Sequence, residues 1–284
     1  MFFYPLGCSA RPHPARRASF PGFISLQLMF TRAIVRPPAP NFSGGLTTAG
    51  LGAPNYERAL EQHEAYCAAL EQCGLTLTRL EPDPNHPDST FAEDTAILTA
   101  RGSVLARPGA PSRRDEVASM GHVIANFFPS LHAIQSPGTL DAGDVCEAGN
   151  HFFIGISERT NEAGAQQLAE LLAAFGYTSC LVNIRDVNAL LHLKSGLACL
   201  GDNQLVVTEA LADRAEFSGY NLVRVNSHEA YAANCVRVNG RILVAAGYPT
   251  FAKQLRELGY QTITLDMSEF QKMDGGLSCL SLRF

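Results

Sequence analysis

Residues 273–284 of the sequence read MDGGLSCLSLRF, a glycine pair followed by a cysteine and an alternating apolar run. The apolar residues stand at every second position up to Phe284, which predicts a short, half-buried β-strand. The two glycines allow backbone conformations that a Cβ would forbid, so a tight turn precedes this strand. A thiol at the mouth of a strand is well placed to act as a nucleophile, although most free cysteines are small buried hydrophobes. The rest of the sequence favours the first interpretation of Cys279.

A unit of strand, turn, strand, helix and strand recurs every ~40–50 residues from Met29 onward. The first unit is expected to have a strand over 30–35, an amphipathic helix over 56–73 and a strand over 75–80. Further units begin near residues 88, 140, 191 and 234, each with a hairpin turn. The strand over 30–35 and the strand over 279–284 lack hairpin partners, so pairing them would close a ring without free edges. The sequence therefore predicts an α/β fold, a five-bladed α/β propeller of strand-strand-helix-strand repeats around a central axis.

The domain organisation follows from length and composition. The 284 residues are 46% hydrophobic and 17% charged, which is enough for a substantial core. We expect residues 29–284 to form a single catalytic domain. Residues 1–28 hold three arginines and four prolines but no Asp or Glu. We expect them to be an N-terminal extension that is disordered or not translated, a transit peptide being the alternative.

Charge and cysteine usage limit the classes of partner. The net charge is −5 without a long basic run, so a nucleic-acid partner is not expected. No apolar segment reaches the ~18–20 residues that cross a bilayer, so no membrane partner is expected. The eight cysteines include no Cys-x-x-Cys pair and no zinc spacing, which favours reduced thiols in a cytoplasmic protein without a metal. The expected partner is a small-molecule substrate, and the sequence leaves room for a homodimer.

Polar residues recur near the start of the first strand of each hairpin. Taken singly, an acidic residue there is commonly a turn former and a lone histidine a satisfied core residue. In a ring, however, equivalent positions point to one axis, where a thiol, an imidazole and carboxylates together are the parts of a cysteine-dependent hydrolase. These residues are Glu93 and Asp94, Asp141 and Asp144, His192, Asn234, and Cys279.

Four segments resemble the signature segments of the dimethylarginine dimethylaminohydrolases, which belong to the guanidino-group-modifying (pentein) superfamily. The resemblance runs in order over residues 29–284 and implies the superfamily's five-bladed α/β propeller. It also implies that Cys279 is the nucleophile, His192 the general acid/base and Asp141 the catalytic carboxylate. The four segments are Phe91-Ala92-Glu93-Asp94-Thr95, Leu140-Asp141-Ala142-Gly143-Asp144, Leu191-His192-Leu193-Lys194-Ser195-Gly196 and Asp274-Gly275-Gly276-Leu277-Ser278-Cys279.

The same resemblance implies a set of substrate contacts. Asp94 would grip the guanidinium with an aromatic ring beside it, and further residues would hold the α-amino group and the α-carboxylate. Arginines suit a carboxylate because of their forked geometry, although ordinary surface charge is the alternative for both of them. The expected contacts are Asp94 and Phe91 at the guanidinium, Asp88 and the main chain of Leu46 and Met273 at the amino group, and Arg113 and Arg159 at the carboxylate, with Glu93 as a further substrate-binding residue.

The implied reaction is hydrolysis of Nω-methylated arginines, dimethylated or monomethylated, to citrulline and an alkylamine. It would pass through a covalent thiouronium on Cys279 and need no cofactor. Nearby carboxylates should raise the pKa of the thiol, and the bound guanidinium cation would offset this effect.

Several alternatives remain open at this stage. Another enzyme of the superfamily is one of them: an arginine deiminase, an agmatine deiminase or an amidinotransferase. A binding propeller without chemistry, such as a ribosome-binding factor of this fold, is another. A cysteine protease or amidase is a third, but it would leave the acidic pocket unexplained.

Overall fold

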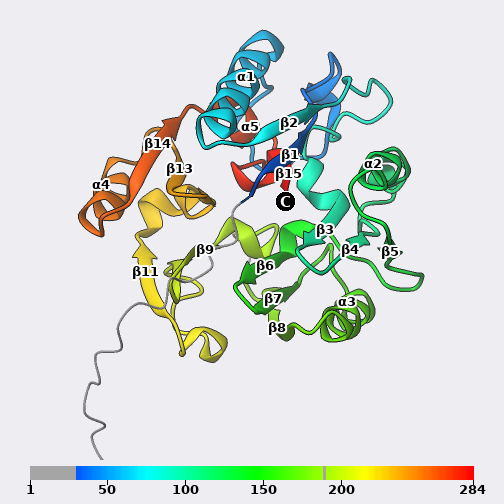
Figure 1. Cartoon of the computed structure of the whole chain (residues 1–284). Helices are drawn as coiled ribbons and strands as arrows, with labels where there is room; N and C mark the ends of the chain where they lie inside the picture. The colour runs from blue at the N-terminus through cyan, green and yellow to red at the C-terminus, as the bar shows by residue number, and fades with distance from the viewer. Residues whose placement is uncertain (1–29, 188–189) are drawn as a thin grey trace, which may run out of the picture.

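The computed structural model describes residues 30–187 and 190–284. Within these residues the strands form five three-stranded sheets around a central axis, with helices outside them (Figure 1). The predicted five-bladed α/β propeller is therefore confirmed. The prediction for residues 1–28 lies outside the described residues.

Each blade consists of an inner, a middle and an outer strand, the middle one antiparallel to the inner and parallel to the outer. The inner strands are β15 (Ser281–Arg283), β3 (Ala96–Thr99), β6 (Val145–Ala148), β9 (Leu197–Gly201) and β12 (Val236–Val238). The middle strands are β1 (Arg32–Val35), β4 (Gly102–Leu105), β7 (His151–Ile156), β10 (Gln204–Thr208) and β13 (Arg241–Ala245). The outer strands are β2 (Thr76–Arg79), β5 (His132–Ala133), β8 (Thr178–Asn183), β11 (Asn221–Val225) and β14 (Gln261–Leu265).

The first blade is built from both ends of the described chain. β1 pairs antiparallel with β15, with Ala33 opposite Arg283 and Val35 opposite Ser281. This pairing is the ring closure expected from the sequence, and it gives β1 a hydrogen-bonded neighbour on each side.

Helices cover four of the five blades: α1 (Tyr56–Gln72), α2 (Glu116–Ile124), α3 (Glu162–Ala174) and α4 (Pro249–Glu257), with a short α5 (Ser268–Gln271) after β14. α1 begins as predicted, because the side chain of Asn55 accepts the N–H of Arg58, and it ends before Gly74, whose φ is +92°. The fourth blade departs from the repeat. Only a 3₁₀ turn, η6 (Ala215–Phe217), stands between its last two strands, and the buried residues there do not follow a helical period.

The polar residues of the axis lie in or beside short 3₁₀ helices that precede the inner strands, and not within strands as predicted. These helices are η2 (Ala92–Thr95), η4 (Ala142–Asp144), η5 (Leu193–Ser195), η7 (Ser227–Ala233) and η8 (Ser278–Leu280). η2 packs against η8 and η4, and η5 packs against η4 and η7. They form a ring of 3₁₀ helices around the axis, and the inner strands leave from it.

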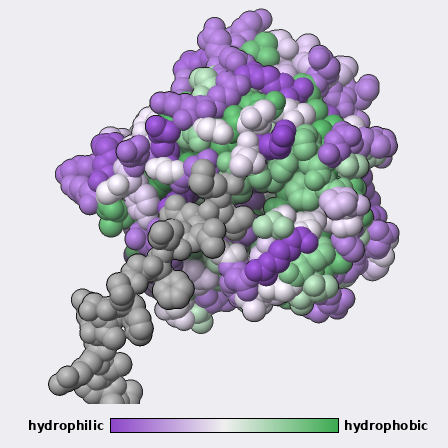
Figure 2. All heavy atoms as spheres, viewed as in Figure 1, coloured by the Kyte–Doolittle hydropathy of each residue, from purple (hydrophilic) through white to green (hydrophobic). Residues whose placement is uncertain are grey.

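The hydrophobic core is divided into five clusters between neighbouring blades. Ile34, Leu98 and Leu282 pack together between the first two blades, and Phe153 and Leu205 between the third and fourth. Hydrophilic side chains cover the helices at the rim of the face in Figure 2, whereas apolar ones appear nearer the axis. No helix among the described residues is long and apolar enough to cross a membrane. The apolar core lies between neighbouring blades and does not fill the central axis.

Candidate active site

A small cavity of about 30 Å³ lies at the end of the axis where the 3₁₀ ring begins the inner strands. It brings together almost all of the site residues that the sequence predicted; Asp141 lies behind it and Glu93 elsewhere. It is lined by Leu46, Asp88, Phe91, Asp94, Arg113, Arg159, Leu191, His192, Met273, Asp274, Gly275 and Cys279.

His192 is held by a carboxylate from the neighbouring blade. Its Nε2 lies 3.0 Å from Oδ2 of Asp141, which is fully buried and whose Oδ1 accepts the N–H of Gly109 at 2.8 Å. Burial lowers the pKa of His192, but Asp94, the hydrogen bond to Asp141 and Asp144 outweigh this and raise it to about 9. The imidazole is therefore protonated near neutral pH, which is the form that donates a proton.

The close approach of His192 and Asp94 depends on Gly143. A Cβ at this position would come within 2.8 Å of both Oδ1 of Asp94 and Nδ1 of His192. The N–H of Gly143 also donates to Oδ1 of Asp94 at 3.0 Å. Gly143, in the second of the four signature segments, is thus required by packing.

Cys279 stands in η8, three residues after Gly276. The ring of Phe91 occupies the place of a Cβ on Gly275, and the side chain of Asn234 that of one on Gly276. The N–H of Gly276 points to Sγ of Cys279 at 3.4 Å. Burial, followed by Glu93 and Asp94, raises the pKa of Cys279 to about 12. This is the direction that the sequence predicted, although burial is its first cause.

Arg113 is not surface charge, and its environment differs from the predicted carboxylate contact. Its side chain is buried and donates to Asp94 at 2.6 Å and to Glu116 at 3.0 Å. It also donates to the carbonyl oxygens of Phe91 and Asp88. Because these acceptors engage most of its donors, Arg113 mainly fixes the carboxylate of Asp94.

Asp88 and Arg159 fit their predicted places better. The carboxylate of Asp88 is buried and accepts the N–H of Leu46 at 3.0 Å. Burial raises its pKa, against the lowering effect of Arg113 and Arg159. Arg159 lines the same cavity, and its guanidinium makes no hydrogen bond to another described side chain. A ligand with an ammonium and a carboxylate would meet opposite charges here.

Glu93 does not line this cavity, and its role as a substrate contact stays a prediction. Its carboxylate accepts from Lys194 at 2.7 Å, from Ser278 Oγ at 2.7 Å and from Arg283 at 3.2 Å. Glu93 and Asp94 are successive residues of a 3₁₀ helix, so their side chains leave it in different directions. Glu93 lines a second cavity instead.

Sequence reasoning missed two supporting residues. Glu116 forms the second ion pair of Arg113, and its spacing of three residues in sequence is the signal that was available. Lys194 stands within one of the quoted segments, but no role was given to it. Asn234 was singled out by its phase alone, and it joins two parts of the site: it donates to the carbonyl oxygen of Lys194 and accepts the N–H of Ser278.

Asp94, Asp141 and His192 also have the geometry of a cation site, since one ligand atom of each lies within 4.8 Å of the others. Hydrogen bonds within the protein explain this arrangement. Both carboxylates accept from backbone N–H groups, and they also pair with Arg113 and His192 respectively. The donor set therefore fits a protonated imidazole between carboxylates.

Comparison with known proteins places the chain in a family. The family model described as arginine deiminase matches residues 57–236. The N(G),N(G)-dimethylarginine dimethylaminohydrolase of Pseudomonas aeruginosa is 43% identical over 257 residues, which cover 90% of this chain and 100% of the relative. The chain belongs to the dimethylarginine dimethylaminohydrolase family. The dimethylarginine dimethylaminohydrolase of Streptomyces coelicolor is 36% identical over 89% of this chain and 96% of its own length.

Solved structures agree with this family assignment. The P. aeruginosa dimethylarginine dimethylaminohydrolase, as a cysteine-to-serine mutant complexed with citrulline, superposes with a TM-score of 0.88 and 42% identity, covering 90% of this chain and 100% of that one. The N-terminal domain of ArgZ, a cyanobacterial arginine dihydrolase, superposes with a TM-score of 0.80 at 20% identity, covering 90% of this chain and 97% of that one, and shares the fold.

Proposed function

We propose that this protein hydrolyses Nω-methylated arginines, asymmetric dimethylarginine and monomethylarginine, to citrulline and dimethylamine or methylamine. Hydrolase chemistry on the C–N bond is the activity of the family to which the chain belongs. The observation that carries the proposal is one cavity lined by Cys279, His192 and Asp94, in which His192 is bonded to Asp141.

In the first half-reaction, Cys279 releases its thiol proton to solvent as the guanidinium binds, and the thiolate attacks the central carbon of the guanidinium. A C–S bond forms, and the C–N bond to the methylated amine breaks as its electron pair takes the proton of His192. The pKa of about 9 keeps His192 protonated for this step near neutral pH. Asp94 and Asp141 place negative charge beside the cation and the imidazolium.

In the second half-reaction, the neutral His192 takes a proton from water. The water oxygen bonds to the same carbon, the C–S bond breaks as the sulfur takes the second proton of that water, and citrulline leaves with Cys279 returned as a neutral thiol. Asp141 holds the imidazole in one orientation through both steps, because its own position is fixed by Gly109 and Thr160.

The thiol needs its substrate in order to ionise. A pKa of about 12 leaves Cys279 neutral near pH 7, and the guanidinium cation would lower it by offsetting Glu93 and Asp94. Asp88 and Arg159 would hold the ammonium and carboxylate of a free amino acid, which favours arginine derivatives over agmatine.

The test compares the wild type with Cys279→Ser on dimethylarginine, monomethylarginine and arginine, scoring citrulline together with dimethylamine, methylamine or ammonia. Cys180→Ser, in outer strand β8, is the matched control for loss of a thiol. We expect citrulline and alkylamine from the wild type and the control, and neither from Cys279→Ser with an unchanged melting temperature. Ammonia from arginine as the main product would indicate an arginine deiminase instead, and full activity in Cys279→Ser would remove the nucleophile assignment.

We also propose a cytoplasmic setting. The seven cysteines among the described residues are all free, and burial raises the pKa of each of them, which suits a reducing compartment. A homodimer stays a prediction, and sedimentation of the purified protein tests it.

A further inference from the structure

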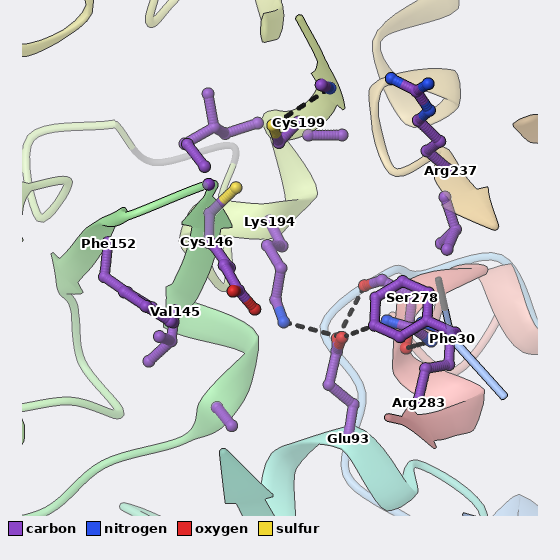
Figure 3. A pocket seen from close by; sticks show the side chains of 18 of the residues that line it. Phe30, Glu93, Val145, Cys146, Phe152, Lys194, Cys199, Arg237, Ser278 and Arg283 are labelled. Carbon is purple, nitrogen blue, oxygen red and sulfur yellow. Dashed lines mark hydrogen bonds and ion pairs between the residues drawn. The ribbon is translucent and has the colours of Figure 1, made fainter. Parts of the chain in front are cut away.

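A second and larger cavity, of about 420 Å³, runs along the propeller axis (Figure 3). Residues of all five inner strands line it, among them Leu98, Val145, Leu197, Val236 and Leu282. It shares no lining residue with the active-site cavity. Its volume lies in the range of small-molecule sites in proteins.

The two cavities are separated by the ring of 3₁₀ helices. On the side of the axial cavity, Lys194, Ser278 and Arg283 converge on the carboxylate of Glu93 (Figure 3). Glu93 and Ser278 directly precede Asp94 and Cys279 in the sequence. The floor of the axial cavity is therefore the reverse side of the active site, and the rest of the cavity extends away from it along the strands.

The cations that line the axial cavity are already matched within the protein. Lys194 and Arg283 both pair with Glu93. Arg237 donates to the carbonyl oxygens of Leu200 and Asn239 and pairs with Asp202. No lining Lys or Arg among the described residues thus lacks a partner that an anionic ligand would have to supply.

Two lining acceptors, in contrast, have no partner. Oε1 of Glu147 and Oδ1 of Asn239 are buried and accept no hydrogen bond within the described residues. The amide nitrogen of Asn239 donates to the carbonyl oxygens of Phe30 and Cys73, which fixes its oxygen as the free end. Burial raises the pKa of Glu147 to about 7, against the lowering effect of Lys194 and Arg101. The Glu147 side chain is only partly buried and lines the cavity, so a donor bound there can supply the partner that its carboxylate lacks.

The walls between these acceptors are apolar and aromatic. Phe30 and Tyr220 line the cavity together with aliphatic residues of the inner strands. Aromatic faces attract cations and exclude anions. A cationic head with N–H donors and an apolar body therefore matches both the acceptors and the walls.

We propose that the axial cavity is a second ligand site, and that it takes a small organic cation, a protonated amine or amidine with an aromatic or aliphatic body. Glu147, which lines the cavity on the third blade, supplies the charge partner. The site is separate from the catalytic groups, because Cys279, His192, Asp141 and Asp94 do not line it.

The test uses benzylamine as the probe and measures its binding to the full chain by titration calorimetry. We expect benzylamine to bind the wild type, and benzyl alcohol and benzoate to bind at least tenfold more weakly. Glu147→Gln keeps the shape but removes the charge, and it should weaken benzylamine binding at least tenfold while citrulline formation is retained. Glu257→Gln, at an exposed position of α4, is the control for loss of one negative charge and should bind as the wild type does.

Two further measurements keep the result attributable to this cavity. Benzylamine should shift the methyl resonances of Val145, Leu197 and Val236 in the wild type, which does not depend on any variant folding. Binding should persist in Cys279→Ser and in the presence of citrulline, so that failure of the proposed reaction would leave this result standing. Equal binding to wild type and Glu147→Gln, unshifted methyl groups, or displacement by citrulline would each overturn the proposal and leave the axial cavity to solvent.

Discussion

Replacing Asn234 with alanine should slow turnover without weakening substrate binding to the same degree. Asn234 donates to the carbonyl oxygen of Lys194 at 3.0 Å and to Ser278 Oγ at 3.1 Å, and accepts the N–H of Ser278 at 2.8 Å. It therefore ties the 3₁₀ helix that follows His192 to the one that carries Cys279, but it does not line the active-site cavity.

The magnitude follows from the groups that the alanine would leave buried. The N–H of Ser278 and the carbonyl oxygen of Lys194 would lose this partner, at about 1–3 kcal/mol each. We expect the free energy of unfolding to fall by about 2–6 kcal/mol on this count. A displacement of the nucleophile by about 1 Å relative to the imidazole would cost about 10²-fold in kcat.

The assay measures kcat and KM for dimethylarginine, together with urea unfolding. Asn221→Ala, at an exposed position of β11, is the matched control and should change neither. We expect kcat of Asn234→Ala to fall at least tenfold and KM to change less than threefold. If stability fell while kcat stayed within twofold of the wild type, Asn234 would be structural only, and the positioning argument would be wrong.

Four further outcomes follow from the site. Asp141→Asn should move the alkaline limb of the pH–kcat profile to lower pH, because its hydrogen bond helps to raise the pKa of His192 to about 9; an unmoved limb would contradict this. His192 should stabilise the fold fully below pH 6.5 and lose this contribution as the pH rises through 9, which urea unfolding of the wild type and His192→Asn at pH 6 and pH 9.5 would measure. Iodoacetamide should alkylate Cys279 mainly at high pH, and guanidinium ion should shift the profile to lower pH; the same profile with and without the ion would count against substrate-assisted ionisation. Asp274→Gly removes the carboxylate that accepts from Thr48, and glycine tolerates the φ of +57° at this position. We expect KM to rise a few-fold at nearly constant kcat. An unchanged KM would show that this contact does not order the cavity wall.

The ring and its closure could be predicted from the sequence, because they leave local signals. Alternation in residues 280–284, the unpartnered strand near Val35 and the Asn239-Gly240 turn each have a physical period or a turn chemistry. The 3₁₀ helices of the axis leave no such signal, since three or four residues are too few to show a period. The sequence pattern therefore predicts strands where the structure has these 3₁₀ helices.

The sequence predicts which residue types gather at the site more fully than it predicts the direction in which each side chain points. Cys279, His192 and Asp94 line one cavity as their common phase indicated. Glu93 could not be separated from its neighbour, because sequence adjacency does not say on which side of a 3₁₀ turn a carboxylate emerges. Arg113 looked available for a ligand, and only its burial beside Asp94 and Glu116 shows where most of its donors go.

Because β1 pairs antiparallel with β15, the nucleophile next to β15 reaches its place only when the ring of blades closes. During synthesis β1 is the first of the described strands to be made, and one of its edges stays unpaired until β15 has been made. The segment that then pairs with this edge also carries Cys279. A chain cut short before β15 can thus be neither sealed nor reactive. Because Cys279 lies in the segment made last, incomplete chains would not react with guanidines. The unpaired edge of β1 is where such chains would aggregate.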